Sequence, residues 1–520
     1  MRRTGAGLAT AAASAGLAGA AGTQPSARRP NILVILADDM GYSDLGCYGS
    51  EIRTPNLDGL AENGMRFTQF YCAARCCPSR ATLLTGLYPH QAGMGRMVSA
   101  PGAAAEPGPY QGYLNDRCAT IAEVLKPAGY RTYMSGKWHV GEAPEHWPRQ
   151  RGFDRYFGLI SGASSYFELL KEPDRQRFMA LDDAPFEPEG DDFYMTDAFT
   201  DFAVECLEQH DTAQPFFLYL AYTAPHWPLH AWPEDIARYR DAYHDGWDAL
   251  RARRYARMRE LGIIDPRWRL SPRDEEVPPW DDMDNKEDWA LRMAVYAAMI
   301  DRMDQGVGRV MQALRATGEE ENTLVLFLSD NGACHENIEG RKLNQPGALP
   351  GDRRSYVAYR RPWANASNTP FRLFKHWIHE GGIATPLIAR WPAVIPEPGA
   401  LTPEVGHIID IMATCTDVAG VPYPERRNGQ RLVPLEGKTL RPVLEGRSRP
   451  GHDALYWEHF RNRGIRQGDW KLVATKTGDW ELYDLAADRT ELTDLSGRYP
   501  EKAKELNAAY DAWAARCGVS

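Results

Sequence analysis

Four short apolar segments of this 520-residue chain each end just before polar side chains that can take part in catalysis. The segments and the residues after them are 31–36 with Asp38 and Asp39, 131–135 with Lys137 and His139, 216–220 with His226, and 323–328 with Asp330 and Asn331. One such pair could be an ordinary turn or helix cap. Because parallel strands end at the same edge of a sheet, four of them predict an α/β fold with one shared site at that edge.

The rest of the chain predicts helices around this sheet and a smaller unit at the end. Apolar residues recur at steps of three and four in one helical stripe, formed by Met293, Tyr296, Ile300, Met303, Val307, Val310 and Leu314. After about residue 445, short strands around 454–457, 470–473 and 480–483 precede a helix at 501–515. We therefore expect a large, mostly parallel sheet flanked by helices in 29–445, and a small antiparallel subdomain with a terminal helix in 446–520.

The segment 76–86 (CCPSRATLLTG) is the most specific string in the sequence. Pro78 suits the first turn of a helix, and the apolar residues 81–84 would bury that helix. Cys76 would then lie at the helix N-terminus, where free N–H groups and the helix dipole favour an anion.

Simpler explanations of Cys76 are weaker. A zinc site would need a second ligand pair at short spacing, which Cys72, Cys76 and Cys77 lack. A thiol phosphatase loop would need arginine where Thr82 stands. A buried or disulfide-bonded cysteine stays open, although nine scattered cysteines are not typical of a disulfide framework.

With Cys76 in its first position, this string resembles the signature of the type I sulfatases. The resemblance extends from NILVILADDMGYSDLGCYG to LYDLAADRTELTDL, and NTPFRLFKHWIHEGGIATPLIARWP is similar to bacterial arylsulfatases. It implies an alkaline-phosphatase-like fold and hydrolysis of an aryl or carbohydrate sulfate ester to an alcohol or phenol plus sulfate. It also implies that a maturation enzyme oxidises Cys76 to formylglycine, whose hydrated aldehyde is the nucleophile.

The same resemblance implies a metal site and a set of catalytic side chains. The expected ligands are Asp38, Asp39, Asp330, Asn331 and the nucleophile at position 76; such hard oxygen ligands suit calcium, or else magnesium, and not zinc.

The catalytic roles come from matched motifs. Arg80 would hold the formylglycine, Lys137 and Lys375 would clamp the sulfate, His226 would protonate the leaving group, and His139 would act as the base. Taken alone, each would more often be a loop or surface residue; their positions in GKWH, TAPHWP and FKHW favour the catalytic interpretation.

Charge and hydropathy exclude other classes of function. A net charge of −10 argues against a nucleic-acid partner, which needs phosphate neutralisation. No apolar run is long enough to predict a membrane span. Positive charge is concentrated between 353 and 379, a pattern usual for a solvated surface. We expect 336–370 and the region after His226 to shape the substrate pocket.

The first 28 residues predict an export signal. Arg2 and Arg3 precede an uncharged stretch at 4–24, and residues 18–20 (AGA) form a small-residue cleavage site. The layout is twin-arginine-like and predicts a periplasmic or secreted protein. A disordered Ala/Gly tail is the alternative.

Two other functions are compatible with parts of the pattern. One is a phosphonate monoester or phosphodiester hydrolase of the same superfold. The other is a sulfated-glycan binding protein in which Cys76 is never matured, although such a protein would not need both histidines and both lysines.

Overall fold

The computed structural model describes residues 1, 5, 28–102, 106–172 and 175–520. Most of the predicted export signal therefore lies outside the described residues. Among the helices that are described, none combines the length and apolarity needed to cross a membrane.

In the described part of the chain, ten strands form one large sheet in the order β10-β2-β9-β8-β1-β7-β3-β4-β5-β6. Its strands are β1 (Asn31–Ala37), β2 (Met65–Tyr71), β3 (Arg131–Gly136), β4 (Arg155–Leu159), β5 (Met179–Leu181), β6 (Ala184–Phe186), β7 (Phe216–Ala221), β8 (Thr323–Ser329), β9 (Ala384–Arg390) and β10 (Ala400–His407). The five adjacent strands β8-β1-β7-β3-β4 are parallel to one another, whereas β9 is antiparallel to both β8 and β2. The predicted mostly parallel sheet is confirmed.

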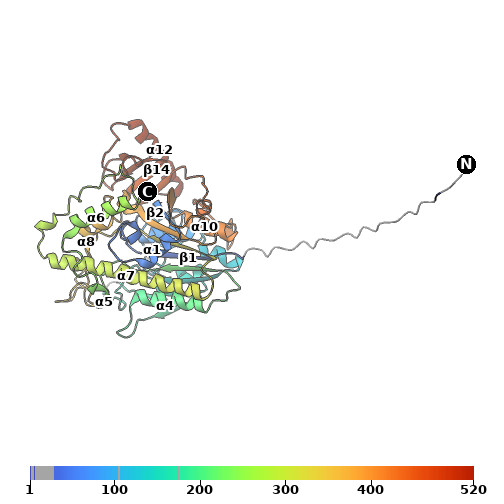
Figure 1. The fold of residues 1–520 in the computed structure, drawn as a ribbon, viewed down its shortest axis with the longest axis horizontal. Helices are drawn as coiled ribbons and strands as arrows, with labels where there is room; N and C mark the ends of the chain where they lie inside the picture. Colours follow the sequence, from blue (N-terminus) through green and yellow to red (C-terminus); the bar gives the residue numbers. More distant parts are fainter. Residues whose placement is uncertain (2–4, 6–27, 103–105, 173–174) are drawn as a thin grey trace.

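The alternating side chains of β1 show why its whole sequence is apolar. Leu33 and Ile35 face one hydrophobic core, and Ile32 and Val34 face another. The first core contains residues of α1 (Pro55–Glu62), α4 (Met195–Glu208), α5 (Pro233–Ala237), α6 (Gly246–Glu260), α7 (Lys286–Ala316) and α8 (Arg360–Ser367). The second contains residues of α2 (Cys76–Thr85), α3 (Ile121–Leu125), α10 (Asp410–Ala419) and α11 (Arg441–Leu444). Helices therefore cover both faces of the sheet. The predicted apolar stripe belongs to α7, the long helix that runs beside α4 in Figure 1.

The C-terminal part forms the predicted small antiparallel sheet, with strands β13 (Leu455–His459), β14 (Asn462–Gln467), β15 (Trp470–Ala474) and β16 (Glu481–Asp484) followed by α12 (Pro500–Cys517). Strand β14, with the sequence NRGIRQ, was not predicted. It carries too few apolar residues for a periodic signal, and pairing with β13 and β15 makes it a strand. Two short strands, β11 (Arg426–Arg427) and β12 (Gln430–Arg431), lie apart from both sheets.

A buried cluster of charges joins this small sheet to the large one. Lys471 of β15 lies 2.8 Å from Glu380, at the start of α9 (Glu380–Ile383), and 2.8 Å from Glu491. Arg489 also contacts Glu380 at 2.8 Å. All four side chains are fully buried, so the two sheets are held together by ion pairs that water does not screen.

Candidate active site

The four predicted strands lie side by side, in the order β8-β1-β7-β3, and the polar residues after them meet at one edge of the sheet. Asp38, Asp39, Lys137, His139, His226, Asp330 and Asn331 come from these strand ends, and Cys76 and Arg80 come from α2. Lys375 follows no strand; its backbone N–H donates to Ala333 (3.1 Å), which anchors it beside Asn331. All ten predicted site residues are buried.

Asp38 is at the centre of the first half of the site. Its Oδ2 lies 2.5 Å from Lys137 Nζ and 3.4 Å from Arg80 Nη2. Arg80 also contacts Asp330 at 2.8 Å and donates to the backbone oxygen of Lys137 at 3.0 Å. Arg80 is thus tied to α2, β1, β3 and β8 together, which fixes the start of α2 against the sheet edge.

Asp39 organises the second half. Lys375 Nζ lies 2.7 Å from Asp39 Oδ1, Asn331 Nδ2 donates to the same oxygen at 2.7 Å, and His226 Nε2 lies 3.4 Å from Oδ2. Although burial opposes ionisation, Asp39 raises the pKa of Lys375 well above its usual value, so the lysine is charged.

The donor set at the strand ends fits a divalent cation. Three buried carboxylates converge here, and two buried oxygens, Asp38 Oδ1 and Asn331 Oδ1, have no hydrogen-bond partner among the described residues. Burial and the nearby Asp330 raise the pKa of Asp38 to about 7 although Lys137 and Arg80 lie beside it, as expected where buried carboxylates repel one another. Ligand atoms of Asp38, Asp39 and His226 lie within 4.8 Å of one another. Hard oxygen atoms of this kind suit calcium or magnesium.

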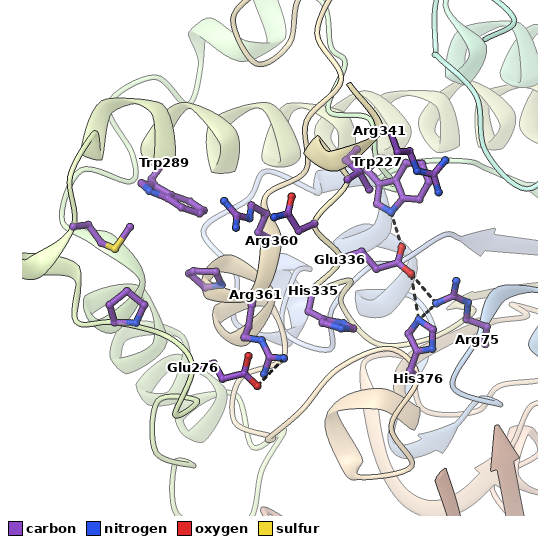
Figure 2. Close-up of a pocket in the computed structure, with 15 residues that line it drawn as sticks. Arg75, Trp227, Glu276, Trp289, His335, Glu336, Arg341, Arg360, Arg361 and His376 are labelled. Atoms are coloured by element: carbon purple, nitrogen blue, oxygen red, sulfur yellow. Dashed lines mark hydrogen bonds and ion pairs between the residues drawn. The ribbon is translucent and has the colours of Figure 1, made fainter. Parts of the chain in front are cut away.

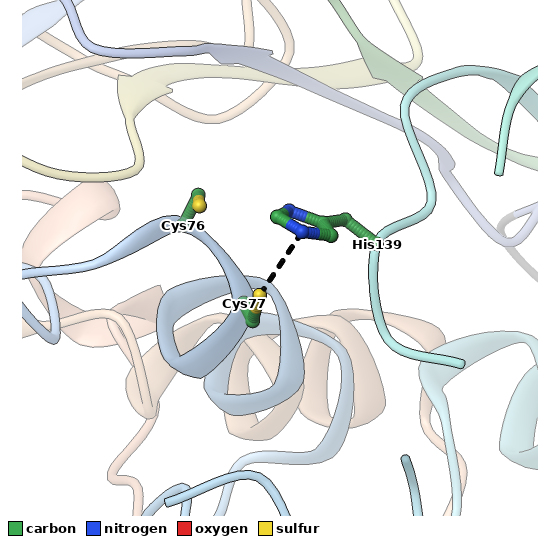
Figure 3. Close-up of side chains that lie close together, drawn as sticks. All are labelled: Cys76, Cys77 and His139. Atoms are coloured by element: carbon green, nitrogen blue, oxygen red, sulfur yellow. Dashed lines mark hydrogen bonds between the residues drawn. The ribbon is translucent and has the colours of Figure 1, made fainter. Parts of the chain in front are cut away.

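Cys76 is the first residue of α2, as predicted, and is 2% exposed. His139 Nε2 lies 3.2 Å from the Cys77 thiol, and the imidazole reaches both cysteines (Figure 3). A hydrogen bond from Cys77, together with Lys137 and His139, lowers the pKa of Cys76 well below its usual value, although burial opposes this. All nine cysteines are free and buried, so none is held in a disulfide.

Two cysteines and one histidine also resemble three ligands of a zinc site. The sequence argument against zinc considered only ligands that are close together in the chain. It therefore did not include His139, which follows β3, whereas both cysteines lie on α2. Conversion of Cys76 to formylglycine would remove one of the two sulfurs, so metal analysis distinguishes the two interpretations.

Burial favours the neutral form of both histidines, and the shift is large for His139. Burial lowers the pKa of His139 to about 3, and burial also lowers the pKa of His226, an effect that Asp39 partly offsets. A neutral imidazole at His139 can accept a proton, which a general base must do.

Some residues at the site have a left-handed backbone conformation. Asp39, Ala74, His139 and His376 have φ angles of 68°, 62°, 56° and 86°. Positive φ is uncommon outside glycine and costs free energy, so it persists only where the surroundings enforce it, which is typical of functional sites.

A cavity of about 800 Å³ opens beside the buried centre (Figure 2). Its lining includes Trp227 and residues 336–338, 341 and 360–362, which belong to the two segments that the sequence predicts to shape the substrate pocket. The basic stretch 353–379 is divided among environments: Lys375 lies in the centre, Arg360, Arg361 and His376 line the cavity, and Arg354 pairs with Asp352 outside it.

Sequence reasoning missed two groups at the site. Glu336 lies 2.9 Å from Arg75 and accepts a hydrogen bond from Trp227 (2.8 Å). In the sequence, the one indication of these contacts was that Arg75 directly precedes Cys76. Nothing in the sequence indicated a role for Gly162. An ideal Cβ built on it would lie 2.3 Å from His139 Nε2, so only glycine leaves room for that ring.

Comparison with protein families gives two matches. The family model described as Sulfatase matches residues 30–421, and the model described as N-sulphoglucosamine sulphohydrolase, C-terminal, matches residues 371–510.

Individual relatives align over most of the chain. An uncharacterized sulfatase of Schizosaccharomyces pombe is 37% identical over 95% of this chain and 95% of its own length. An arylsulfatase of Klebsiella aerogenes is 35% identical over 81% of this chain and 93% of its own. The N-acetylgalactosamine-6-sulfatase of Canis lupus familiaris is 29% identical over 88% of this chain and 73% of its own.

Solved structures share the fold. The crystal structure of Ps i-CgsB in complex with k-i-k-neocarrahexaose has a TM-score of 0.69 and 26% identity, and the match covers 94% of this chain and 93% of that one. A structure in complex with its substrate D-glucosamine-2-N,6-O-disulfate has a TM-score of 0.64 and 22% identity, covering 94% and 98%.

Proposed function

The chain belongs to the sulfatase family, and from this membership we propose that its buried centre hydrolyses sulfate esters through a formylglycine formed from Cys76. The family and its alkaline-phosphatase-like fold make the protein a sulfuric ester hydrolase. Beyond this activity, we propose the identity of the nucleophile and of the metal, the role of each side chain and the compartment in which the enzyme acts.

One observation carries the assignment of the nucleophile. Cys76 begins α2 at the sheet edge with the neutral His139 against it, and Lys137 and Lys375 are held nearby by Asp38 and Asp39. Two lysines and a helix N-terminus concentrate positive charge where an anionic sulfate would bind.

The roles of the side chains follow from this arrangement. One hydroxyl of the formylglycine hydrate attacks sulfur, while Lys137 and Lys375 bind the sulfuryl oxygens and His226 gives a proton to the leaving oxygen. His139 then takes a proton from the second hydroxyl, so that the aldehyde re-forms and sulfate leaves. Arg80 keeps the residue at position 76 in place.

Asp38, Asp39, Asp330, Asn331 and the residue at position 76 would hold the metal, which we propose is calcium. When bound, the cation supplies positive charge that polarises the nucleophile and offsets the charge of the sulfuryl oxygens. The partnerless oxygens of Asp38 and Asn331 support this assignment.

Two measurements on the purified enzyme test the assignment. Mass spectrometry of the peptide 76–80 should show formylglycine in place of cysteine, which requires a formylglycine-generating enzyme in the expression host. Turnover of p-nitrophenyl sulfate should exceed turnover of the matched phosphate esters. Unmodified Cys76 in fully active enzyme would refute the nucleophile, and faster hydrolysis of a phosphodiester or phosphonate monoester would instead assign the other hydrolase activity.

We also propose that residues 1–28 direct export to the periplasm or the medium. The support is the twin-arginine layout of the sequence. Mass analysis of protein from its native host should give a start between 21 and 29. An intact Met1 in a cytoplasmic fraction would contradict the proposal.

A further inference from the structure

The cavity beside the centre is where the alcohol or phenol part of a substrate would lie. Three lining residues are direct chain neighbours of proposed catalytic residues: Arg75 precedes Cys76, Trp227 follows His226, and His376 follows Lys375. A sulfate held by the lysines would therefore direct the rest of the molecule into this cavity. Its volume of about 800 Å³ is typical of pockets that enclose a whole small ligand.

The lining of this cavity is unusually polar for a binding pocket. It contains four arginines, two glutamates and two histidines, with Trp227 and Trp289 among the few apolar surfaces. A bare phenol would leave most of these groups without partners, which costs binding free energy. A ring that carries several hydroxyl groups would satisfy them, so the lining favours a sugar.

Two of the four arginines are already neutralised. Arg75 lies 2.9 Å from Glu336, and Arg361 lies 3.1 Å from both Asp274 and Glu276. Although burial opposes it, the charges of Lys375 and Arg75 lower the pKa of Glu336 well below its usual value, so this carboxylate stays ionised and paired. These pairs leave no free charge for a ligand.

Arg341 and Arg360 differ from the other two. Among the described residues, their nearest carboxylates are Glu172 at 3.5 Å and Glu339 at 3.7 Å. Both carboxylates already have closer partners: Arg177 bonds Glu172, and Arg292 lies 2.7 Å from Glu339. Within this part of the chain, Arg341 and Arg360 therefore make only the longer ion pairs of their clusters, which leaves their N–H groups open to a ligand.

Each of these two arginines is positioned by a tryptophan. The guanidinium of Arg341 lies 4.9 Å from the ring centre of Trp227, and that of Arg360 lies 5.4 Å from the ring centre of Trp289 (Figure 2). Stacking on an indole orients a guanidinium without satisfying its N–H groups. The side chains remain 40% and 33% exposed, so a ligand can reach them.

We infer, on the basis of the proposed function, that the substrate is a sulfated sugar carrying a second anionic group, a carboxylate or a further sulfate, that Arg341 and Arg360 bind. Arginine forms two parallel hydrogen bonds with either group. A carboxylate and a second sulfate share this chemistry, and the substrates compared in the experiment distinguish between them.

The experiment compares four substrates: p-nitrophenyl sulfate, a monosulfated sugar, the same sugar with a second sulfate, and a sulfated uronic acid. The wild-type enzyme should have a kcat/KM at least about tenfold higher on one of the doubly anionic sugars than on the monosulfated one. Arg341→Gln and Arg360→Gln should each reduce this ratio by about tenfold, mainly through KM. Arg354→Gln is the matched control, because Arg354 pairs with Asp352 outside the cavity, and it should leave the ratio unchanged.

A salt titration separates charge recognition from a structural effect. In the wild-type enzyme, added NaCl should raise KM for the doubly anionic sugar more than for the monosulfated one, because salt screens exposed charges. The double variant should lose this difference. Equal wild-type kcat/KM on the sugars, or variants that reduce all substrates equally, would overturn the inference. A matured enzyme that hydrolyses none of the four esters would instead refute the proposed function.

Discussion

The buried centre and the cavity beside it both contain many charges, but they hold them differently. In the centre, Lys137, Arg80 and Lys375 are fully buried and lie 2.5–2.8 Å from carboxylates. In the cavity, Arg341 and Arg360 are partly exposed, and the nearest carboxylates in the described part of the chain lie 3.5 and 3.7 Å away.

This difference separates the chemistry from the choice of substrate. A buried, tightly paired charge is expensive to move, so the centre presents one fixed geometry to a sulfate. An exposed arginine on an indole can adjust to its ligand. Changes in the centre should therefore affect every substrate alike, whereas changes in the cavity should alter only the preference among substrates.

The largest expected effect is at Cys76. A serine supplies one hydroxyl in place of the two of a formylglycine hydrate, so sulfate could be transferred to it but not released internally. Cys76→Ser should lose multiple turnover on all substrates by at least about 10³-fold and accumulate a covalent sulfate on peptide 75–80. Cys76→Ala should lose both turnover and the covalent sulfate, and mass spectrometry of the same peptide should show no sulfate on it. Sustained wild-type turnover by the serine variant would rule out the formylglycine mechanism.

Removal of the metal should have the next largest effect. Exhaustive chelation, checked by metal analysis, should abolish activity on all substrates and lower the melting temperature. A cation at 100 times its Kd contributes about 2.7 kcal/mol to folding stability. Calcium should restore both properties better than magnesium or zinc. Unchanged activity and stability in the metal-free protein would show that Asp38, Asp39, Asp330 and Asn331 hold no required ion.

Gly162→Ala should have an intermediate effect. The new Cβ would meet only the end of the His139 side chain, so the ring would shift while the backbone stays in place. Misplacement of a catalytic group by about 1 Å should reduce kcat about 10²-fold, by the same factor for sugars and for p-nitrophenyl sulfate. Gly451→Ala is the control, because its Cβ meets nothing within 4 Å. A substrate-dependent loss would break the proposed division between centre and cavity.

The smallest effect on catalysis should come from the buried ion pairs between the two sheets. Lys471→Met leaves Glu380 and Glu491 buried without their shared lysine, which should lower the free energy of unfolding by about 3–5 kcal/mol. The preference among substrates should not change. The exposed Lys476 provides the control Lys476→Met, with an expected change within about 0.5 kcal/mol. A changed preference would mean that loss of stability alone can imitate an effect of the cavity.

The stability difference between the wild type and Lys471→Met should depend on pH. Burial raises the pKa of Glu380, but Lys471 and Arg489 outweigh this and lower it from 4.5 to about 2. A carboxyl whose pKa is lower in the folded state stabilises the protein above the unfolded pKa and loses this contribution as it becomes protonated. Denaturant unfolding should therefore give the full difference above pH 4.5 and a shrinking one as the pH falls towards 2. A difference that does not vary with pH would contradict this account.

Much of the fold and the location of the site could be predicted from the sequence. The segments at 31–36, 131–135, 216–220 and 323–328 were correctly predicted as strands, and the residues after them do meet at one edge. Other strands were not predicted, among them β2, β9 and β10 of the large sheet and β14, whose sequence lacks an apolar period. The position of Lys375 came from a motif resemblance, because no strand precedes it.

The sequence alone determined the four central strands, the helix that begins at Cys76 and the edge at which the polar residues gather, because these depend on local periodicity and on the direction of parallel strands. Only the tertiary structure decided the contact of Gly162 with His139, and which cavity arginines are neutralised. Arg341 makes only a long ion pair because Glu172 lies closer to Arg177. Arg360 makes only a long ion pair because Glu339 lies closer to Arg292. Such pairings join segments far apart in the chain, and no local pattern encodes which of several arginines lies nearest a given carboxylate.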